Sequence, residues 1–215
     1  MALVNANYEF LHVNVGTNGR VSDGGVFENS FFCEKLLNDK LKLPKTQRTK
    51  NGMNFVFVGD DAFPLHKHLM KPFPQKKLTR EQTIFNYRLS RARRIFENAF
   101  GIFSARFRIF HTEINLKPEN IDKVILASCV LHNFLRKKCA NSYAPPKLIG
   151  NENIETAEVI LGEWRNSSSA FGELQKTNYN NSADCAKATR IEYMKYFNGP
   201  GKVSWQDKMI NKGSY

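Results

Sequence analysis

Apolar residues recur at steps of three and four in four stretches of the chain, at 26–41, 81–108, 120–138 and 183–197. This spacing predicts four helices, each with one buried face. In the longest stretch, Gly101 lowers helix stability by about 1 kcal/mol relative to alanine, so we predict that the helix ends or bends there. The expected core positions of the two longest helices are Ile84, Ala92, Ile95, Phe96, Ala99, Phe100 and Phe103 in the first, and Ile121, Val124, Ile125, Ala127, Leu131 and Phe134 in the second.

Two shorter stretches have the pattern of strands. Residues 8–15 alternate between apolar and polar side chains, and residues 55–58 form a short apolar run of the kind found in buried strands. Prolines at 64, 72 and 74 exclude a long helix before residue 79.

The composition changes beyond about residue 141, where asparagine and serine become frequent, at 151, 153, 166–169 and 178–182. Such clusters predict loops. We therefore expect a globular domain at 1–140 and, at 141–215, an extension of Asn/Ser-rich loops and helices.

The chain is strongly basic, with 32 Lys and Arg residues against 20 Asp and Glu residues and a net charge of +12. This charge indicates a polyanionic partner such as nucleic acid, or a basic solvated surface without a partner. No apolar run approaches the roughly 18 residues of a membrane span, and no signal peptide is recognisable, so we expect a nuclear or cytoplasmic protein. The cysteines lack zinc-finger spacing and are expected to be reduced thiols.

Two carboxylates stand out by their positions. Asp60 follows the predicted strand at 55–58, where a strand end would hold its side chain rigidly. Glu97 lies inside the 81–108 helix, with Arg93 and Phe100 as helical neighbours. A carboxylate beside an apolar ring needs compensation, which either a divalent metal or an ion pair with Arg93 would supply.

Arg88, Arg91 and Arg94 line another face of the same helix. They either contact the phosphates of a nucleic acid or form a solvated face.

Three histidines do not predict a metal site. His66 and His68 lack a cysteine or a third histidine at ligand spacing. His132 is expected to be a hydrogen-bonded core residue.

Several motifs follow one another in a fixed order: S-D-G-G-V-F at 22–27, V-F-V-G-D-D-A-F-P-L at 56–65, F-N-Y-R-L-S-R-A-R-R-I-F-E-N-A-F-G at 85–101, R-F-R-I-F at 106–110 and V-L-H-N-F-L at 130–135. Together they resemble the motifs of the Harbinger-type DDE transposases, a family of metal-dependent DNA endonucleases. The resemblance covers residues 1 to about 138. By position, Asp60 matches the second acidic residue of the family's catalytic triad and Glu97 matches the third.

The resemblance implies an α/β fold of the RNase H-like type, a mixed sheet flanked by helices. It also implies that three carboxylates hold two divalent ions, Mg²⁺ or Mn²⁺, which prefer hard oxygen ligands. Asp60 and Glu97 are then expected to face one another across a shared site. Double-stranded DNA is the expected partner, with a separate DNA-binding protein or a second copy of the chain as further partners.

Three departures from the family pattern bear on activity. The first aspartate of the family lies in an Asp-Gly-Lys/Thr-His motif, and this chain contains no such motif. Asn5 and Asn14 stand where relatives typically carry aspartate, and the family's DNA-reading N-terminal region has no counterpart here. We therefore expect an N-terminally truncated catalytic domain without its first strand region.

Such a domain is expected to retain DNA affinity but little or no nuclease activity. One alternative is a non-catalytic, domesticated module that binds DNA or protein. Another is an enzyme whose missing carboxylate comes from a partner chain.

Overall fold

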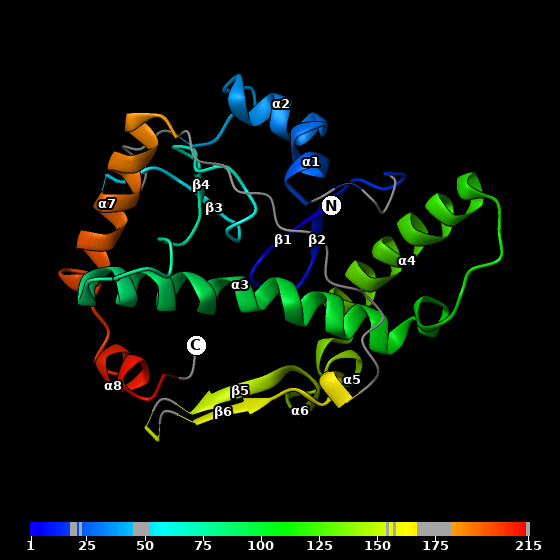
Figure 1. The fold of residues 1–215 in the computed structure, drawn as a ribbon. Coiled ribbons are helices and arrows are strands. Elements are labelled where there is room, and N and C mark those ends of the chain that lie inside the picture. Colours follow the sequence, from blue (N-terminus) through cyan, green and yellow to red (C-terminus); the bar gives the residue numbers. More distant parts are fainter. Residues whose placement is uncertain are drawn as a thin grey trace. The chain divides into compact units, whose positions relative to one another are not determined.

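The computed structural model describes residues 1–17, 21, 23–44, 52–153, 155–156, 158–166 and 182–213 of a mixed α/β structure rich in helices (Figure 1). Its described strands form three two-stranded sheets, whereas the family resemblance implies one mixed sheet. The chain divides into two compact units, of which the first comprises residues 1–18 and 94–173 and the second residues 19–93 and 174–215. Each unit thus draws residues from both of the parts that the sequence predicts.

The helix α3, Arg80–Arg106, is the longest element and passes from the second unit into the first. It confirms the predicted helix at 81–108. The helix does not end at Gly101, as predicted, but continues to Arg106. Two predicted core positions, Ala92 and Phe96, are exposed instead. The buried apolar positions are Ile84, Phe85, Tyr87, Leu89, Ala99, Ile102 and Phe103. Within the described part of the chain, neither α3 nor any other helix is long and apolar enough to cross a membrane.

In the first unit, β1, Ala2–Val4, pairs antiparallel with β2, Phe10–Val13, and the helix α4, Pro118–Lys138, packs on β2. The sequence predicts only the second of these strands. Phe10, Phe103 and Cys129 form the centre of a core here. The other elements of the unit are η2, Arg108–His111; α5, Ala140–Tyr143; α6, Pro146–Ile149; β5, Gly150–Asn153; β6, Glu158–Leu161; and η3, Glu163–Asn166.

The β5–β6 pair occupies a region that the sequence predicts as loop. Asn151 and Asn153 lie in β5, where antiparallel pairing with Ile160 and Glu158 of β6 overrides their preference for turns. The predicted loop residues 167–169 and 178–181 lie outside the described residues.

The predicted apolar face of α4 is only partly correct. Ser128, Cys129 and His132 are buried, whereas Leu131 and Phe134 are about half exposed. Polar side chains occupy the inner face because they bind the backbone of the β1–β2 hairpin, which an apolar side chain could not do.

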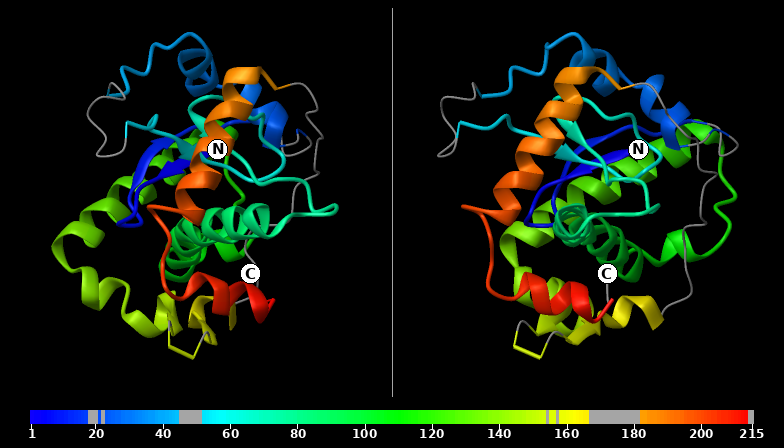
Figure 2. Two further views of the ribbon diagram at one scale, coloured as in Figure 1. Left: turned by 90° about the vertical axis from the view of Figure 1, so that its left-hand side faces the viewer. Right: turned by 60° about the vertical axis from the view of Figure 1, so that its left-hand side comes forward.

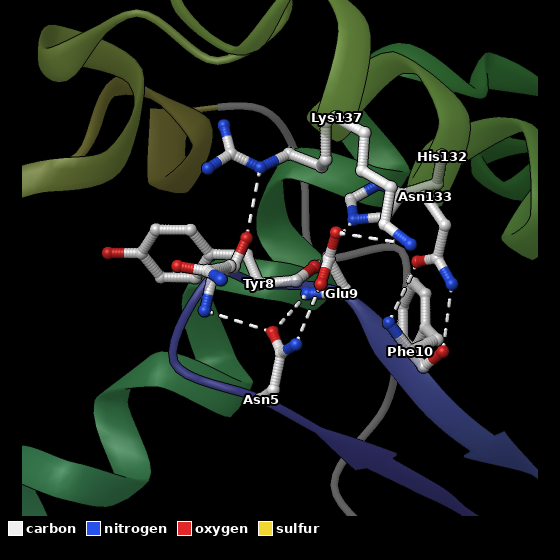
Figure 3. Close-up of polar contacts among 9 residues, drawn as sticks. Asn5, Tyr8, Glu9, Phe10, His132, Asn133 and Lys137 are labelled. Carbon is white, nitrogen blue, oxygen red and sulfur yellow. Dashed lines mark hydrogen bonds and ion pairs between the residues drawn. The ribbon is translucent and has the colours of Figure 1, made fainter.

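Two side chains of α4 make these bonds (Figure 3). Asn133 accepts from the Phe10 N–H through Oδ1 and donates to the Phe10 carbonyl through Nδ2, both at 2.8 Å. His132 Nε2 lies 2.7 Å from the Tyr8 carbonyl, and His132 Nδ1 lies 2.9 Å from the Tyr143 hydroxyl. Because a carbonyl only accepts, Nε2 carries the proton and the Tyr143 hydroxyl donates to Nδ1. His132 is therefore the hydrogen-bonded core residue that the sequence predicts.

The second unit contains α1, Asp23–Glu28; α2, Phe31–Leu37; β3, Phe57–Val58; β4, Leu69–Met70; α7, Asp184–Asn198; and α8, Gln206–Asn211. The strands β3 and β4 are parallel, and α7 lies beside them (Figure 2). The core of this unit joins β4 and α7 to the first half of α3 through Leu65, Met70, Phe85, Leu89 and Ala186.

The single helix predicted at 26–41 is two helices, α1 and α2, because Ser30 begins the second one. The Ser30 hydroxyl accepts from the Cys33 N–H at 3.0 Å and donates to the Phe27 carbonyl at 2.6 Å. A serine at this position is a preferred helix start, and its extended backbone stops the preceding helix.

Gly101 allows η3 to pack against α3 in the first unit. A Cβ atom at residue 101 would lie 2.2 Å from Trp164 Cδ2, far inside van der Waals contact. The Trp164 indole N–H donates to Asn98 Oδ1 at 3.1 Å, one turn before Gly101. The glycine is thus explained by close packing of an indole ring on the helix.

The Gly101→Ala substitution tests this packing. Alanine favours a helix by about 1 kcal/mol over glycine, but overpacking costs about 1–3 kcal/mol, so the variant should have a lower free energy of unfolding in urea. In a Trp164→Ala background the same substitution should stabilise the protein instead. A stabilising effect of Gly101→Ala with Trp164 present would contradict the packing.

A second prediction concerns His132 and pH. Burial lowers the pKa of His132, and the nearby Arg136 lowers it further, against the opposing effects of the Tyr8 carbonyl and Glu9. The unfolded chain therefore binds a proton at this site before the folded chain does, as pH falls below the ordinary value of about 6.5. Its contribution to stability is complete above that pH and decreases below it.

We expect the free energy of unfolding to fall between about pH 6.5 and 5, and His132→Gln to reduce this slope. The slope should not vanish, because burial also lowers the pKa values of His12 and His66. The measurement is urea unfolding at several pH values, and an identical slope in the variant would refute the assignment.

Candidate carboxylate site

Asp60 lies at the carboxyl end of β3, after Gly59, whose N–H donates to the Met70 carbonyl and continues the pairing with β4. Asp60 Oδ1 accepts from the Ala62 N–H at 2.9 Å, which fixes the side chain in a tight turn. Asp60 Oδ2 lies 3.6 Å from an Arg93 guanidinium nitrogen, and the Asp60 side chain is 30% exposed. Asp60 thus follows a strand end, as the sequence predicts, but the buried strand predicted at 55–58 is wrong, because β3 comprises only Phe57–Val58 and the side chains of Phe55 and Val58 are exposed.

The surroundings of Asp60 are basic. The Lys71 ammonium donates to the Asp61 carbonyl at 3.2 Å. Burial lowers the pKa of Lys71, and the charge of Arg190 lowers it further, whereas Asp61 and Asp60 raise it. Arg93 and Lys71 are thus cationic neighbours of Asp60 and Asp61.

Glu97 lies in the half of α3 that belongs to the first unit. Its Oε2 atom is 3.0 Å from an Arg165 guanidinium nitrogen, with the side chains 36% and 33% exposed. The Arg165 guanidinium also lies 4.3 Å from the centre of the Trp164 ring. Asp60 belongs to the second unit and Glu97 to the first. Each carboxylate has an arginine beside it within its own unit, Arg93 for Asp60 and Arg165 for Glu97.

Of the three arginines predicted to bind DNA, Arg88 has the most elaborate contacts within the protein. It donates to the Gly201 carbonyl and to Gln206 Oε1, both at 3.1 Å, and its guanidinium lies 4.6 Å from the centre of the Phe197 ring. Burial lowers its pKa. Arg88 therefore helps to hold the segment between α7 and α8.

The other two arginines also contact the protein. Arg91 lies over the Trp205 ring at 5.3 Å. Arg94 lies 3.8 Å from Glu152 of β5, whose side chain is only 6% exposed. Each of the three arginines therefore contacts another part of the protein, and the prediction of a purely solvated face does not hold.

Asn5 has a structural role in the hairpin turn (Figure 3). Its Oδ1 accepts from the N–H groups of Asn7 and Glu9, and its Nδ2 donates to Glu9 Oε2 at 2.7 Å. An aspartate would replace this donated bond by repulsion between two carboxylates. Asn14 follows β2, and its N–H donates to the Met1 carbonyl at 2.8 Å.

The acidic residues that the structure describes do not form a complete metal site. Among those residues no group of three His, Cys, Asp or Glu side chains is arranged to hold an ion. Asp60 and Glu97 are each already in contact with an arginine. Two such carboxylates do not supply the charge that a pair of divalent ions needs, so the residues present do not fit a two-metal centre.

No sequence motif marks Arg165 or Trp164 as a neighbour of α3. They lie in the region beyond residue 141, and their contacts with α3 are separated by more than 60 residues along the chain. The one available signal was Gly101, since a glycine inside a long helix often marks a close approach of another group.

Comparison with known proteins shows which family this chain is similar to. Residues 1–133 match the family model described as DDE superfamily endonuclease. Over 140 residues the chain is 33% identical to "Protein ALP1-like" of Arabidopsis thaliana, an alignment that covers 62% of this chain and 34% of that protein. The chain thus spans about a third of the length of this curated relative. A search of the solved structures finds no match.

The matched region contains Asp60, Glu97 and the motifs at 22–27, 56–65, 85–101 and 106–110 on which the resemblance to Harbinger-type transposases rests, and it ends within the motif at 130–135. These findings confirm the resemblance. The chain belongs to the DDE superfamily endonuclease family.

Proposed function

We propose that this chain is a transposase-derived DNA endonuclease domain, RNase H-like in ancestry, that binds double-stranded DNA and has little or no cleavage activity as it stands. The observation that carries the proposal is the family match over residues 1–133, which includes Asp60 at a strand end and Glu97 inside α3. In this proposal residues 1–140 correspond to the nuclease domain and residues 141–215 to its extension.

Asp60 and Glu97 are the second and third acidic ligands in this proposal. Asp60 is in contact with Arg93 in the second unit, and Glu97 is in contact with Arg165 in the first. Carboxylate oxygens are the ligands that Mg²⁺ or Mn²⁺ prefers, so the family's ions are the ones that these two positions would attract. The protein's own contribution is to hold both carboxylates rigidly, one at a strand end and one on a helix.

We expect weak DNA cleavage because the chain provides too few negative charges at the family's acidic positions. Two divalent ions held close together repel each other strongly and need several fixed negative charges around them. Here only Asp60 and Glu97 match the family's acidic positions, and Asn5 contributes an amide that is committed to Glu9.

Affinity for DNA follows from the net charge of +12. We assign phosphate contacts to Arg88, Arg91 and Arg94. Arginine has five N–H donors, so a guanidinium that stacks on a ring or donates two bonds within the protein keeps donors for a phosphate. Contacts of this kind carry no sequence information. We assign sequence recognition to a separate DNA-binding protein or to a second copy of the chain.

The DNA prediction is tested with Arg91→Gln/Arg94→Gln. We expect weaker binding to all duplex sequences alike and a slope of log K against log salt that is reduced by about 2, one unit for each lost phosphate contact. The measurement is fluorescence anisotropy over a range of KCl concentrations.

The matched control is Lys40→Gln/Lys187→Gln, which removes the same charge from exposed positions away from α3. An equal loss in both variants would show that only net charge matters. Arg88→Gln is measured separately, after its thermal unfolding has been compared with the parent, because Arg88 also holds Gly201 and Gln206.

The activity prediction is that the chain does not nick supercoiled plasmid in the presence of Mg²⁺ or Mn²⁺. Asp60→Ala and Glu97→Ala are assayed beside it, and all three proteins should give the same background. Robust nicking that both substitutions abolish would overturn the prediction and would show that another group completes the site.

A further inference from the structure

The outer side of α4 is apolar, although it is exposed. Four large apolar residues share that side: Leu126, Val130, Leu131 and Phe134, which are 43%, 70%, 47% and 55% exposed. Three of them follow one another at steps of four residues and Leu131 lies beside them, so the four form one continuous patch, here called the α4 stripe. The opposite side of the helix, with the buried Cys129 and His132, faces the β1–β2 hairpin. A contiguous apolar patch of this kind is typical of a surface that binds another protein.

Charged side chains of opposite sign lie at the two ends of the α4 stripe. Glu119 is exposed in the first turn of α4, whereas Lys137 and Lys138 are exposed in its last turn. Lys123 is exposed between Glu119 and the stripe. If two copies of α4 packed side by side in parallel, each lysine would lie beside its own counterpart and repel it. Antiparallel copies instead bring the acidic first turn beside the basic last turn, and they also align the helix dipoles favourably.

Full overlap of two antiparallel α4 helices gives a self-complementary contact. The midpoint of Pro118–Lys138 is residue 128, so in this register Leu126 of one copy lies level with Val130 of the other. Glu119 of one copy then lies level with Lys137 of the other and next to Lys138. Within its own chain Lys137 is 3.9 Å from Glu9 and remains 68% exposed, so it keeps donors for a second carboxylate. The register that buries the α4 stripe is therefore also the one that pairs its charges.

We propose that the α4 stripe is the surface through which two copies of this chain associate, with their α4 helices antiparallel. The contact is isologous, so each apolar contact and each Glu119–Lys138 contact occurs twice. A standard interface uses roughly 20–30 residues from each partner. One side of the 21-residue α4 offers fewer, so the dimer dissociates at micromolar concentrations. This association goes beyond the proposed function and does not depend on DNA binding or cleavage.

The test is sedimentation equilibrium of the full chain over a range of protein concentrations. About 0.15 M KCl screens the repulsion between two chains that each carry a net charge of +12. Val130→Lys places a charge at the centre of the contact and should raise the dissociation constant by roughly tenfold or more. The matched control is Leu37→Lys, at a 57% exposed position of α2 in the second unit, which should leave association unchanged.

A charge swap tests the antiparallel arrangement. Glu119→Lys should raise the dissociation constant by roughly three- to tenfold, because it turns two attractive contacts into repulsive ones. Glu119→Lys/Lys138→Glu should restore the affinity of the parent chain. All of these substitutions are at exposed positions, so the thermal unfolding of each variant should match that of the parent.

A dimer that Val130→Lys dissociates, that Leu37→Lys retains and that the charge swap restores supports the inference. A chain that is monomeric at every concentration overturns it, as does a dimer that Val130→Lys leaves intact. A charge swap that fails to restore association overturns the antiparallel arrangement. The proposed DNA binding is measured separately by anisotropy, so either proposal can fail without the other.

Discussion

Both carboxylates that match the family's acidic positions are in contact with an arginine. Arg93 contacts Asp60 in one unit, and Arg165 contacts Glu97 in the other. Each pair is partly exposed, so each contributes little to stability by itself. Their main effect is on local charge, because each arginine neutralises one of the two carboxylates on which metal binding would depend. The family's chemistry requires acidic side chains that attract divalent ions, whereas this chain provides two that already have cationic partners.

A second constraint is the need to satisfy backbone groups of the β1–β2 hairpin. His132 and Asn133 bind the carbonyl of Tyr8 and both backbone groups of Phe10, so the inner face of α4 is polar at these positions. The same hairpin uses Asn5 to fix its turn and to donate to Glu9. Asn5 therefore has a present structural use, independent of the residue that relatives carry there. The motif V-L-H-N-F-L combines these roles, with a histidine and an asparagine that hold the hairpin in place.

Local patterns were enough to predict the long helices and the two residues that match the family. The 27-residue α3 and the 21-residue α4 were predictable because their apolar spacing persists over several turns. The split at Ser30 was missed, although serine is a common helix start. The core position of His132 was predicted, but its hydrogen-bond partner Tyr8 was not, because the two residues are far apart in the sequence. The pairing of Asn151 and Asn153 in β5 was missed for a similar reason, since it depends on partners in β6. The role of Arg165 could not be predicted, because only folding brings it to Glu97.

The central claim is that Asp60 and Glu97 alone are too few, and too well neutralised, to hold a pair of divalent ions. It is tested most directly by counting the Mn²⁺ ions bound to the full chain in equilibrium dialysis over a range of metal concentrations. The account predicts at most weak binding of a single ion, which Asp60→Asn or Glu97→Gln reduces further. Tight binding of two Mn²⁺ ions for each chain, lost in either variant, would contradict it.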